Sequence, residues 1–393
     1  MTENLRVAMI GYGFMGAAHS QGWRVAPRFF DLPAQPAMSV VVGRNHAAVT
    51  AAADKWGWSE AATDWRDVIA RDDIDVVDIV TPGDTHAEIA IAALEAGKHV
   101  LCEKPLANSV AEAEAMTDAA ARAAERGVRA MVGFTYRRVP AATFARDLIA
   151  AGRIGVIRQV RASYRQDWLM DAEAPLTWRM QKDRAGSGAL GDIGAHAVDL
   201  SEYITGLRLQ SVSGVIDTIV TERPLLASGQ GLSGTASTER GAVTVDDIAL
   251  FSGRYEGAAG GYAPLGIFEA TRFATGRKNA LTIEVSGSLG AVSFDLERLN
   301  ELEFYDATLP PTEQGFRTIL VTEHDHPYLA PWWPAGHMLG YEHGFSHQVV
   351  DFVTAIVEGT QPRPSFADGL HVQRVLDAVE RSSAAGSAWI ATD

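Results

Sequence analysis

Two short segments of the chain carry side chains that could move a proton to or from a substrate. The first is Cys102-Glu103-Lys104-Pro105, which ends a short apolar run, and the second is Gly191–His196, where a helix is predicted to begin. A lysine at a strand end, with Asp192 and His196 on one helix face, would form a proton-transfer set for a hydroxyl that loses a hydride. An imidazole titrates near neutral pH, whereas a lysine base needs its pKa lowered by desolvation, so we expect His196 to be the base.

An acceptor for the hydride is indicated at the N-terminus. Leu5–Ile10 is an apolar run typical of a buried parallel strand, and it leads directly into the sequence GYGFMG. In this G-x-G-x-x-G pattern the first glycine permits a tight turn, the second lets the backbone approach a pyrophosphate, and the third lets the next helix pack on the strand. The context predicts a dinucleotide site, with contacts from Gly11, Gly13, Phe14, Met15 and Gly16.

The residues expected at the adenosine end leave the choice of dinucleotide open. The second predicted strand, Met38–Val42, should end beside the adenosine ribose, where an acidic side chain would accept hydrogen bonds from both hydroxyls of NAD. This chain has Gly43 and Arg44 there instead. The missing carboxylate and the guanidinium suit the 2′-phosphate of NADP, but an arginine also stacks on the adenine of NAD, so both cofactors remain candidates.

Strand and helix patterns alternate through the first third of the sequence. A capping box at Thr85 and Glu88 is predicted to open one helix, and a second box at Ser109 is predicted to open another. The alternation specifies an α/β fold, a doubly wound parallel Rossmann sheet with helices on both faces, over residues 1–134. The predicted elements are Met38–Val42, His46–Trp56, Asp75–Val80, Thr85–Ala96, His99–Cys102, a helix from Ser109 to Gly127, and Ala130–Phe134.

From about residue 135 the pattern changes to short strands with few helices. Leu281–Val285 alternates apolar and polar residues, as expected for an antiparallel sheet with one covered face. We therefore predict a second, α+β domain over residues 135–393, built on a large, mostly antiparallel open sheet, for substrate binding and oligomerisation. The stretch 222–239, rich in Gly, Ser and Thr, is predicted to be a loop. The other predicted elements are the helices Ala141–Ala151, Glu342–Glu358 and Phe366–Ala384 and the strands Val156–Tyr164, Val212–Val220, Asp247–Phe251 and Ala291–Phe294.

Length, composition and charge exclude several classes of protein. A chain of 393 residues is too long for one hydrophobic core, and 47% hydrophobic with 21% charged residues is ordinary for a globular enzyme. A net charge of −15 argues against a nucleic-acid or membrane-surface partner, and no segment predicts a membrane span or a signal peptide. We therefore expect a cytoplasmic enzyme with a small-molecule partner. The single Cys102 is predicted to be a packed small hydrophobe rather than a nucleophile.

Taken together, these motifs resemble the Gfo/Idh/MocA family, the glucose-fructose oxidoreductase and inositol dehydrogenase group, over essentially the whole chain. Within that family the sequence is similar to the levoglucosan-dehydrogenase-like branch, which oxidises C3 of a pyranose ring with NAD. One departure is Gly43, where that branch keeps an acidic residue, so the cofactor choice does not simply carry over. The resemblance rests on Gly11–Gly16, Thr81-Pro82 with His86, Glu103-Lys104-Pro105 and Gly188–His196 with Asp199, and for the branch on Tyr136-Arg137-Arg138, Gln166-Asp167-Trp168, Trp178-Arg179 and Ala185–Gly188.

The resemblance implies a role for each of these positions. Lys104 would hydrogen-bond the reacting hydroxyl of a sugar or glycoside, His196 would take its proton, and Asp192 would orient the sugar. The family's usual assemblies imply a homodimer or a homotetramer. The implied cofactor contacts, besides the glycine turn, are Gly43, Arg44, Thr81, Pro82, His86 and Glu103, of which the last two would lie near the nicotinamide ribose. The implied substrate contacts are Tyr136, Gln166, Trp168 and Arg179, and the charges of Lys182 and Arg184 make these two further candidates.

Several alternatives use the same residues. Asp192 as a plain N-cap and His196 as a core histidine would be the structural interpretation without the resemblance. Transient C3 oxidation could instead lead to redox-neutral cleavage of a glycoside, while a non-catalytic cofactor-binding regulator would not need the proton-transfer set. Lys182, Asp183 and Arg184 form a solvated turn, or else the basic residues among them form, with Arg179, a pocket for a carboxylate or sulfonate such as that of a sulfoquinovoside. The segment 324–326, His-Asp-His, lacks an evident third ligand, so we predict no metal.

Overall fold

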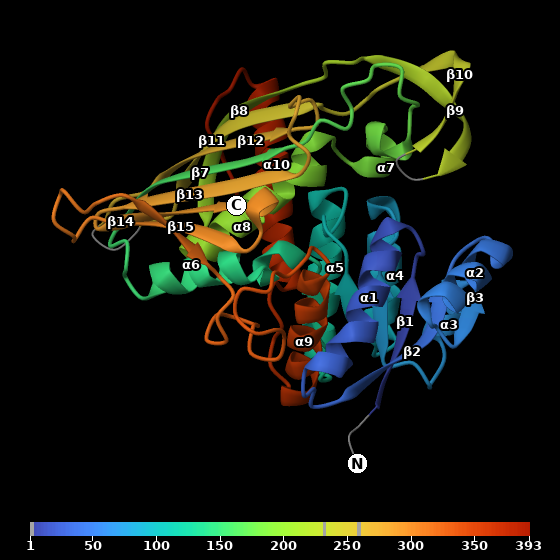
Figure 1. Ribbon diagram of the computed structural model, residues 1–393. Coiled ribbons are helices and arrows are strands. Elements are labelled where there is room, and N and C mark those ends of the chain that lie inside the picture. The colour runs from blue at the N-terminus through green and yellow to red at the C-terminus, as the bar shows by residue number, and fades with distance from the viewer. Residues whose placement is uncertain (1–3, 231–232, 258–260) are drawn as a thin grey trace. The chain divides into compact units, whose positions relative to one another are not determined.

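The computed structural model describes residues 4–230, 233–257 and 261–393, and the chain divides into two compact units (Figure 1). The first unit comprises the residues up to Thr135 together with Tyr341–Gln373, and the second comprises Tyr136–Gly340 and Arg374–Asp393. The return of the C-terminal segment to the first unit is not visible in the sequence pattern, which places a single division at residue 134. It follows from the packing of two distant helices, since a Cβ at Gly22 would lie 2.8 Å from the carbonyl oxygen of Phe345.

The first unit is built on six parallel strands in the order β3-β2-β1-β4-β5-β6, which confirms the predicted doubly wound sheet. The strand order reverses between β1 and β4, and ligands of such sheets bind at the carboxyl ends of the strands beside this reversal. Gly11 follows β1 and Val80 follows β4, so the glycine turn lies there. The strands are β1 (Asn4–Ile10), β2 (Gln35–Val42), β3 (Glu60–Ala62), β4 (Val76–Ile79), β5 (His99–Cys102) and β6 (Ala130–Val132). The helices are α1 (Phe14–Phe29), α2 (His46–Trp56), α3 (Trp65–Ile69), α4 (His86–Glu95), α5 (Val110–Ala124) and α9 (His343–Glu358), with a 3₁₀ turn η1 (Gly83–Thr85) before α4.

Three helices of this unit, α2, α3 and α5, begin where a polar side chain caps them. Asn45 accepts a hydrogen bond from Ala48 N (3.0 Å) at the start of α2. Ser109, whose capping box was predicted, accepts one from Glu112 N (3.3 Å) at the start of α5. The capping box predicted at Thr85 is wrong. Thr85 Oγ1 donates instead to Thr81 Oγ1 (2.7 Å) or Pro82 O (2.8 Å), because η1 precedes α4 and Thr85 already has helical backbone angles.

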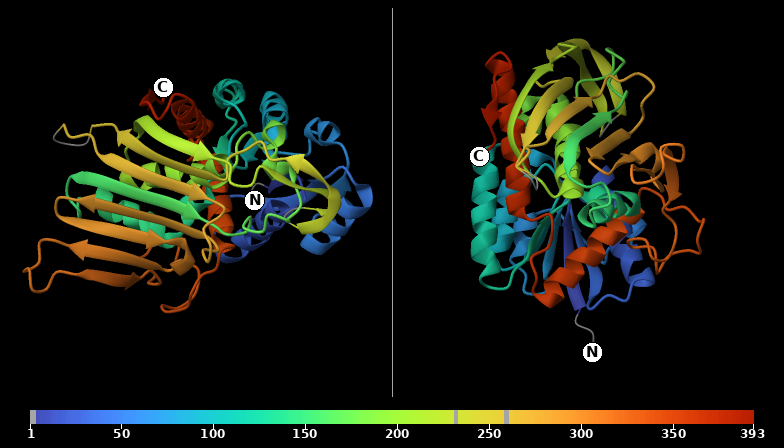
Figure 2. Two further views of the ribbon diagram at one scale, coloured as in Figure 1. Left: turned by 90° about the horizontal axis from the view of Figure 1, so that it is seen from above. Right: turned by 90° about the vertical axis from the view of Figure 1, so that its left-hand side faces the viewer.

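The second unit is built on nine strands in the order β16-β15-β14-β13-β7-β12-β11-β8-β17. Only β7 and β12 run parallel among its described neighbours, so the predicted mostly antiparallel sheet is confirmed. Helices α6 and α8 pack against one face of this sheet (Figure 2). The strands are β7 (Ile157–Arg165), β8 (Leu209–Asp217), β11 (Ile248–Tyr255), β12 (Leu265–Thr271), β13 (Ala280–Gly287), β14 (Gly290–Asp295), β15 (Glu301–Asp306), β16 (Phe316–Leu320) and β17 (Ile390–Ala391). The helical elements are η2 (Thr135–Arg138), α6 (Pro140–Ala150), η3 (Trp178–Met180), α7 (Lys182–Ala185), η4 (Leu190–Gly194), α8 (Ala195–Thr205), η5 (Leu296–Arg298) and α10 (Phe366–Ala384), of which η2 and α10 extend across the unit boundaries.

The loop predicted over residues 222–239 is wrong, because its described residues form an antiparallel hairpin of β9 (Glu222–Gln230) and β10 (Ser233–Ala242). The composition of this stretch favours a loop, but side chains at its base pack inward. The buried Arg223 donates hydrogen bonds to Asp171 O (2.6 Å) and Leu169 O (2.7 Å). Tertiary contacts therefore override the local preference of the sequence.

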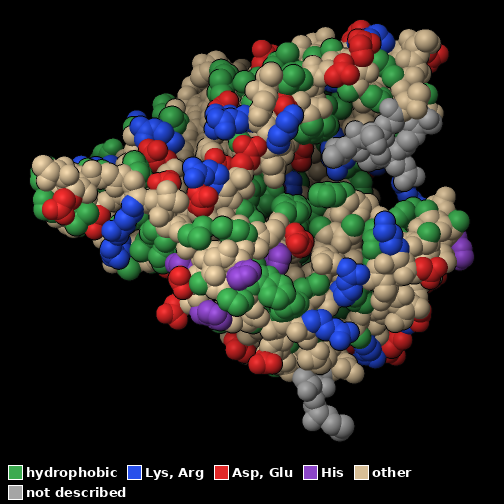
Figure 3. Space-filling view, viewed as in Figure 1, with side chains coloured by type: hydrophobic (Ala, Val, Ile, Leu, Met, Phe, Trp, Pro, Cys, Tyr) green, Lys and Arg blue, Asp and Glu red, His purple; other side chains and the backbone are tan. Residues whose placement is uncertain are grey.

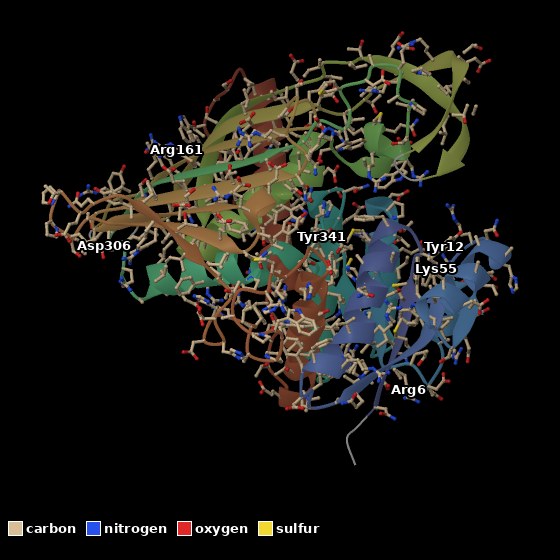
Figure 4. The ribbon with its side chains drawn as sticks, viewed as in Figure 1. Arg6, Tyr12, Lys55, Arg161, Asp306 and Tyr341 are labelled. Carbon is tan, nitrogen blue, oxygen red and sulfur yellow. The ribbon has the colours of Figure 1, made fainter. Side chains whose placement is uncertain are left out.

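The outer face of the nine-stranded sheet is exposed and mixed in character. Figure 3 shows basic and acidic side chains interspersed over this unit, and Arg161, labelled in Figure 4, lies 3.0 Å from Glu284 on the neighbouring strand. Val215, Leu250 and Ile267, on three adjacent strands, are also exposed. Across the described residues, no helix combines the length and the apolar character needed to span a bilayer.

Candidate functional site

The glycine turn between β1 and α1 is shaped for a ligand that approaches the backbone. A Cβ at Gly11 would lie 2.8 Å from Val80 O, and Gly11 has a φ of +115°, so this position requires glycine. A Cβ at Gly16 would lie 2.9 Å from Gly11 O, because α1 packs closely on the turn. Around Gly13 there is no atom within 4 Å of a Cβ position, and no side chain caps α1 there. The turn thus leaves open space at a helix N-terminus, which fits a dinucleotide pyrophosphate.

The position expected to recognise the adenosine ribose is covered by an aromatic ring. A Cβ at Gly43 would lie 2.0 Å from Cε1 and 2.2 Å from Cδ1 of Tyr12, so the ring of Tyr12, labelled in Figure 4, takes the space of a side chain at position 43. The adjacent Arg44 is exposed. Tyr12 lies inside the G-x-G-x-x-G motif, where the sequence pattern assigns no role to the second position. Its contact with Gly43 becomes visible only in the folded unit.

His86 connects the loops that follow β4 and β5. Its Nε2 lies 2.9 Å from Thr81 O and its Nδ1 lies 3.0 Å from Pro105 O, and the side chain is buried. These contacts hold the Thr81-Pro82 loop against the segment that carries Lys104. The predicted cofactor residues of the two loops therefore form one connected group within the first unit.

A buried network that the sequence did not predict lies behind Glu103 and Lys104. His19, on α1, places Nδ1 2.9 Å from Asp78 Oδ2 and Nε2 3.0 Å from Glu103 Oε1. The Trp23 indole donates a hydrogen bond to Asp78 Oδ2 (2.7 Å). The only sequence signal for this network was a histidine shortly after the third glycine of the motif, and a charged Asp78 within the apolar strand β4.

We expect the stability of the protein to fall as the pH rises from about 6.5, the ordinary pKa of a histidine. Burial lowers the pKa of His19, but the Asp78 and Glu103 carboxylates outweigh this effect and raise the pKa to about 10. The folded state therefore keeps a proton that the unfolded state has lost, so this contribution is fully present below pH 6.5 and is lost by about pH 10.

The loss is measured by urea unfolding at several pH values between 6.5 and 10, with an expected slope of up to about 1.4 kcal/mol per pH unit. In His19→Gln, which keeps no titrating group at this position, the same series should show a clearly smaller slope. An equal slope in both proteins would contradict a charged His19 in the folded state.

In the second unit, Asp192 and His196 lie on consecutive turns of a continuous helical segment. Asp192 belongs to η4, a π-helical turn, and His196 lies in the first turn of α8, so the predicted regular helix begins with one wide turn. The start of η4 is held by Asp246, whose Oδ1 accepts from Gly188 N and whose Oδ2 accepts from Leu190 N, both at 2.7 Å. The buried Asp246 thus fulfils the capping role that we considered for Asp192.

We expect Gly188→Ala to destabilise the second unit by about 3 kcal/mol or more, because the new Cβ would overlap backbone atoms. It would lie 1.7 Å from Asp246 O, and that oxygen also accepts from Ala189 N (3.0 Å) and Arg272 Nη2 (3.1 Å). Denaturant unfolding measures the loss. Gly191→Ala is the matched control, since its Cβ would meet the rotatable Ser187 Oγ rather than backbone. Equal stability of both variants would show that the backbone adjusts at position 188.

His196 lies against two tyrosines that begin a chain of hydrogen bonds. Its ring centroid is 4.5 Å from that of Tyr136 and 5.8 Å from that of Tyr164, and the two tyrosine hydroxyls are 2.9 Å apart. Tyr164 OH and Gln166 Nε2 both donate to Asn279 Oδ1, at 2.6 and 2.8 Å. Trp168 Nε1 then donates to Gln166 Oε1 (2.9 Å). The structure therefore connects the predicted substrate residues Tyr136, Gln166 and Trp168. The two residues that link them, Tyr164 and Asn279, were not identified by the sequence motifs.

Two arginines are arranged around Asp192. Arg272 directly follows β12 and is fully buried, with Nη1 3.8 Å from Asp192 Oδ2 and its guanidinium 5.6 Å from the Trp168 ring. The Arg179 guanidinium lies 4.4 Å from the Trp178 ring. Burial lowers the pKa of Arg179, and Asp192 opposes that shift while Arg272 adds to it. Arg272 lies outside every motif used to select site residues, so only the fold identifies it as a partner of Asp192.

The basic side chains considered for an anion pocket, Arg179, Lys182 and Arg184, do not all belong to one group of contacts. Lys182 Nζ lies 2.8 Å from Glu380 Oε2, in an ion pair whose lysine is well exposed. Arg179 instead belongs to the group around Asp192 described above. Arg184 lies with Lys182 on the short helix α7. Lys182 therefore has a carboxylate partner within the protein.

The described residues contain no group of three or more His, Cys, Asp or Glu side chains arranged to hold a metal ion. In the segment 324–326, His326 packs edge-on against Phe144, with ring centroids 4.7 Å apart, and its Nδ1 accepts from Glu323 N (3.0 Å).

Cys102 is fully buried, and burial raises the pKa of its thiol well above the ordinary value. The residue is packed as a small hydrophobe, as predicted.

Comparison with known protein families gives two matches. Residues 5–134 match the family described as "Oxidoreductase family, NAD-binding Rossmann fold", and residues 143–293 match the GFO/IDH/MocA C-terminal domain. The two matches fall on the parallel-sheet unit and on the unit with the nine-stranded sheet. They cover the glycine turn, Lys104, Asp192 and His196.

Individual proteins resemble the chain over its full length. It is 42% identical to levoglucosan dehydrogenase of Pseudarthrobacter phenanthrenivorans, over 99% of this chain and 98% of that protein. A crystal structure of an oxidoreductase domain protein from Kribbella flavida is 62% identical, with a TM-score of 0.94 and complete coverage of both chains. A structure of levoglucosan dehydrogenase in complex with NADH and levoglucosan is 41% identical, with a TM-score of 0.91 over 99% of this chain and 100% of that one.

Proposed function

The chain belongs to the Gfo/Idh/MocA oxidoreductase family and is an NAD-dependent sugar dehydrogenase, and we propose that it oxidises a ring hydroxyl of a pyranose at C3. The observation that carries the proposal is the placement of His196 and Asp192 on consecutive helical turns beside a polar chain of Tyr136, Tyr164, Asn279, Gln166 and Trp168. A sugar presents several hydroxyl groups, and such a chain offers both donors and acceptors to them. The relative that acts on levoglucosan supports the same substrate class.

The first unit supplies the cofactor site in this proposal. The open backbone at Gly13 and the N-terminus of α1 receive the pyrophosphate, because no side chain fills that space. Thr81, Pro82 and His86 form the wall beside the nicotinamide half. A nicotinamide bound there would supply the acceptor for the hydride of the sugar carbon. Phe14 is 65% exposed at the turn, so its ring is available to cover the cofactor.

The proton is handled by side chains of the protein. Lys104 donates a hydrogen bond to the reacting hydroxyl, and His196 accepts the proton of that hydroxyl oxygen as the carbon is oxidised. The aromatic contacts of His196 with Tyr136 and Tyr164 restrict the orientation of its ring. Asp192 orients the sugar, and the buried Arg272 behind it stabilises the charged carboxylate. Arg179, beside Asp192, contacts the sugar as well.

NAD and NADP differ at the adenosine ribose, so the residues at that end of the cofactor site decide between them. We expect a carboxylate at position 43 to disfavour NADPH. In Tyr12→Ala/Gly43→Asp the aromatic ring no longer blocks the new side chain, which then faces the ribose. NADPH affinity should fall about tenfold or more through repulsion of the 2′-phosphate, while NADH affinity stays equal or improves. Fluorescence titration with each reduced cofactor measures both affinities.

Tyr12→Ala alone is the control for loss of the ring. Gly43→Asp alone should bind both cofactors less well than the double variant, because its Cβ overlaps the Tyr12 ring. If both cofactors bind the double variant as they bind the natural protein, position 43 does not contact the ribose.

We further propose that the protein assembles as a homodimer or homotetramer through the outer face of the nine-stranded sheet. Val215 and Leu250 are directly paired across β8 and β11, and with Ile267 they leave an apolar patch on that face. Light scattering on the natural protein and on Leu250→Lys tests this assembly. A mass equal to one chain for the natural protein would contradict it.

The proposed activity is tested by incubating the enzyme with a panel of pyranoses, anhydrosugars and glycosides, each with NAD and with NADP. Reduced-cofactor absorbance reports dehydrogenation, and the released aglycone reports redox-neutral cleavage of a glycoside. We expect accumulation of the reduced cofactor with a neutral pyranose or anhydrosugar, and a 3-keto product identified by NMR. Release of aglycone without accumulation of reduced cofactor would replace the dehydrogenase proposal by a glycosidase.

A further inference from the structure

The buried histidine of the first unit is connected to the backbone of the proposed catalytic lysine. His19 contacts Glu103 Oε1 through Nε2, at 3.0 Å, and Glu103 Oε2 accepts a hydrogen bond from Lys104 N at 3.1 Å. The Glu103 carboxylate therefore links the His19 imidazole on α1 to the backbone N–H of Lys104. The connection crosses from a helix to the loop after β5, and its side chains His19 and Glu103 are buried while Lys104 is partly buried.

Both the backbone and the carboxylate of Glu103 are held by contacts with neighbouring residues. Its own N–H donates to Ile79 O (2.9 Å), which continues the sheet beyond the end of β5. A Cβ at Gly133 would lie 2.7 Å from Glu103 Oε1, so the carboxylate rests directly on the Gly133 backbone. With one oxygen held by His19 and the other by Lys104 N, the carboxylate has little freedom to turn.

The opposite end of the network fixes His19 itself. Nδ1 lies 3.0 and 2.9 Å from the two oxygens of Asp78, which also accepts from Trp23, and the Phe345 ring packs against the imidazole at 5.3 Å between centroids. Each ring nitrogen faces a carboxylate, so an imidazole that donates from both nitrogens satisfies the whole arrangement. A neutral ring would donate to only one of the two carboxylates.

We propose that His19 is a positioning residue for Lys104: it holds the Glu103 carboxylate, which in turn sets the backbone from which Lys104 reaches the substrate hydroxyl. This inference rests on the proposed role of Lys104. The physical reason is the steep dependence of proton transfer on geometry, since a misplacement of about 1 Å can lower a rate by as much as about a hundredfold. A purely structural histidine would affect stability and leave the turnover of the folded enzyme unchanged.

Two substitutions separate the two contacts of His19. The amide of asparagine reaches the position of Nδ1, so His19→Asn keeps a donor to Asp78 and loses the one to Glu103. Glutamine is one methylene longer and reaches the position of Nε2, so His19→Gln keeps a donor to Glu103. Both variants lose the positive charge and both should be less stable, so they differ only in which of the two carboxylates keeps its donor, and Trp23→Phe below controls for the loss of a donor to Asp78.

We expect His19→Asn to lower kcat about tenfold or more, with KM for the sugar and affinity for NADH changed less than about threefold. His19→Gln should recover most of the turnover. Gly133→Ala, whose Cβ would displace the Glu103 Oε1 that His19 contacts while leaving residue 19 unchanged, should lower kcat in the same way, and it keeps the test decisive if His19→Asn does not fold. Trp23→Phe, which removes only the indole donor to Asp78, should be less stable but turn over normally.

Full turnover in both folded His19→Asn and Gly133→Ala would overturn the proposal. Equal impairment of His19→Asn and His19→Gln would overturn it as well, because loss of the charge would then explain both. If the natural protein oxidises no sugar, the proposed function fails, and the positioning role is decided by a second measurement that needs no substrate.

The second measurement is the rate of acetylation of Lys104 by acetic anhydride, read by peptide mass spectrometry with the exposed Lys55 as internal reference. The ratio of the two rates should change by about threefold or more in His19→Asn and Gly133→Ala and remain near the natural value in His19→Gln. An unchanged ratio in all three variants would show that the network does not position the lysine.

Discussion

Replacing Lys104 by alanine is expected to lower turnover by about a hundredfold or more, because a positioned proton-transfer group typically contributes 10² to 10⁴ in rate. Affinity for the reduced cofactor should stay nearly unchanged, since the glycine turn that receives the pyrophosphate is intact. Steady-state kinetics and a fluorescence titration with NADH measure the two effects separately. Lys55→Ala, on the exposed surface of α2, is the matched control and should behave as the natural protein does.

Lys104→Arg adds a second comparison, because it keeps a positive charge but changes the shape and the donor geometry. We expect it to remain strongly impaired. Near-normal turnover of Lys104→Ala would remove the lysine from the mechanism, and the network behind Glu103 would then have a structural role only.

His196→Asn is expected to cause a loss of turnover of similar size, about a hundredfold or more, and to flatten the rising limb of the pH–rate profile near neutrality. Asparagine keeps a polar group beside Tyr136 and Tyr164 but cannot accept and release a proton in this range. The profile of kcat/KM is measured from pH 5 to 9 for both proteins. His326→Asn, in a loop of the same unit, is the control and should leave the profile unchanged.

If His196→Asn loses activity but keeps the shape of the profile, the titrating base is a different group. Lys104 would then be the first alternative, and the Lys104→Ala profile would distinguish the two. Unchanged activity of His196→Asn would contradict a proton-accepting role for the imidazole altogether.

The local features of the fold could be predicted because they depend on residues close together in the chain. The apolar run before Gly11 forms a buried strand, and the three glycines are spaced as a tight turn and a closely packed following helix require. The helices α2 and α10 have the bounds that the sequence predicts for them. The alternating residues of β13 likewise predicted a strand with one covered face, because side chains along a strand point alternately to opposite faces.

The errors in the predicted elements occurred where distant residues outweigh local preferences. The hairpin of β9 and β10 exists despite its loop-like composition, because Arg223 is buried against carbonyl groups outside the hairpin. Thr85 does not cap α4, because a preceding 3₁₀ turn engages its hydroxyl group. Neither contact leaves a periodic signal in the sequence.

By itself the sequence determined the class of chemistry in this protein, through a dinucleotide turn and a lysine, aspartate and histidine in recognisable motifs. Only the tertiary structure decided what surrounds those residues. Tyr12 over Gly43, Arg272 beside Asp192 and His19 behind Glu103 are contacts between side chains from separate elements. A motif records which residue types a short backbone segment needs, whereas burial and charge pairing depend on which segments the fold brings together.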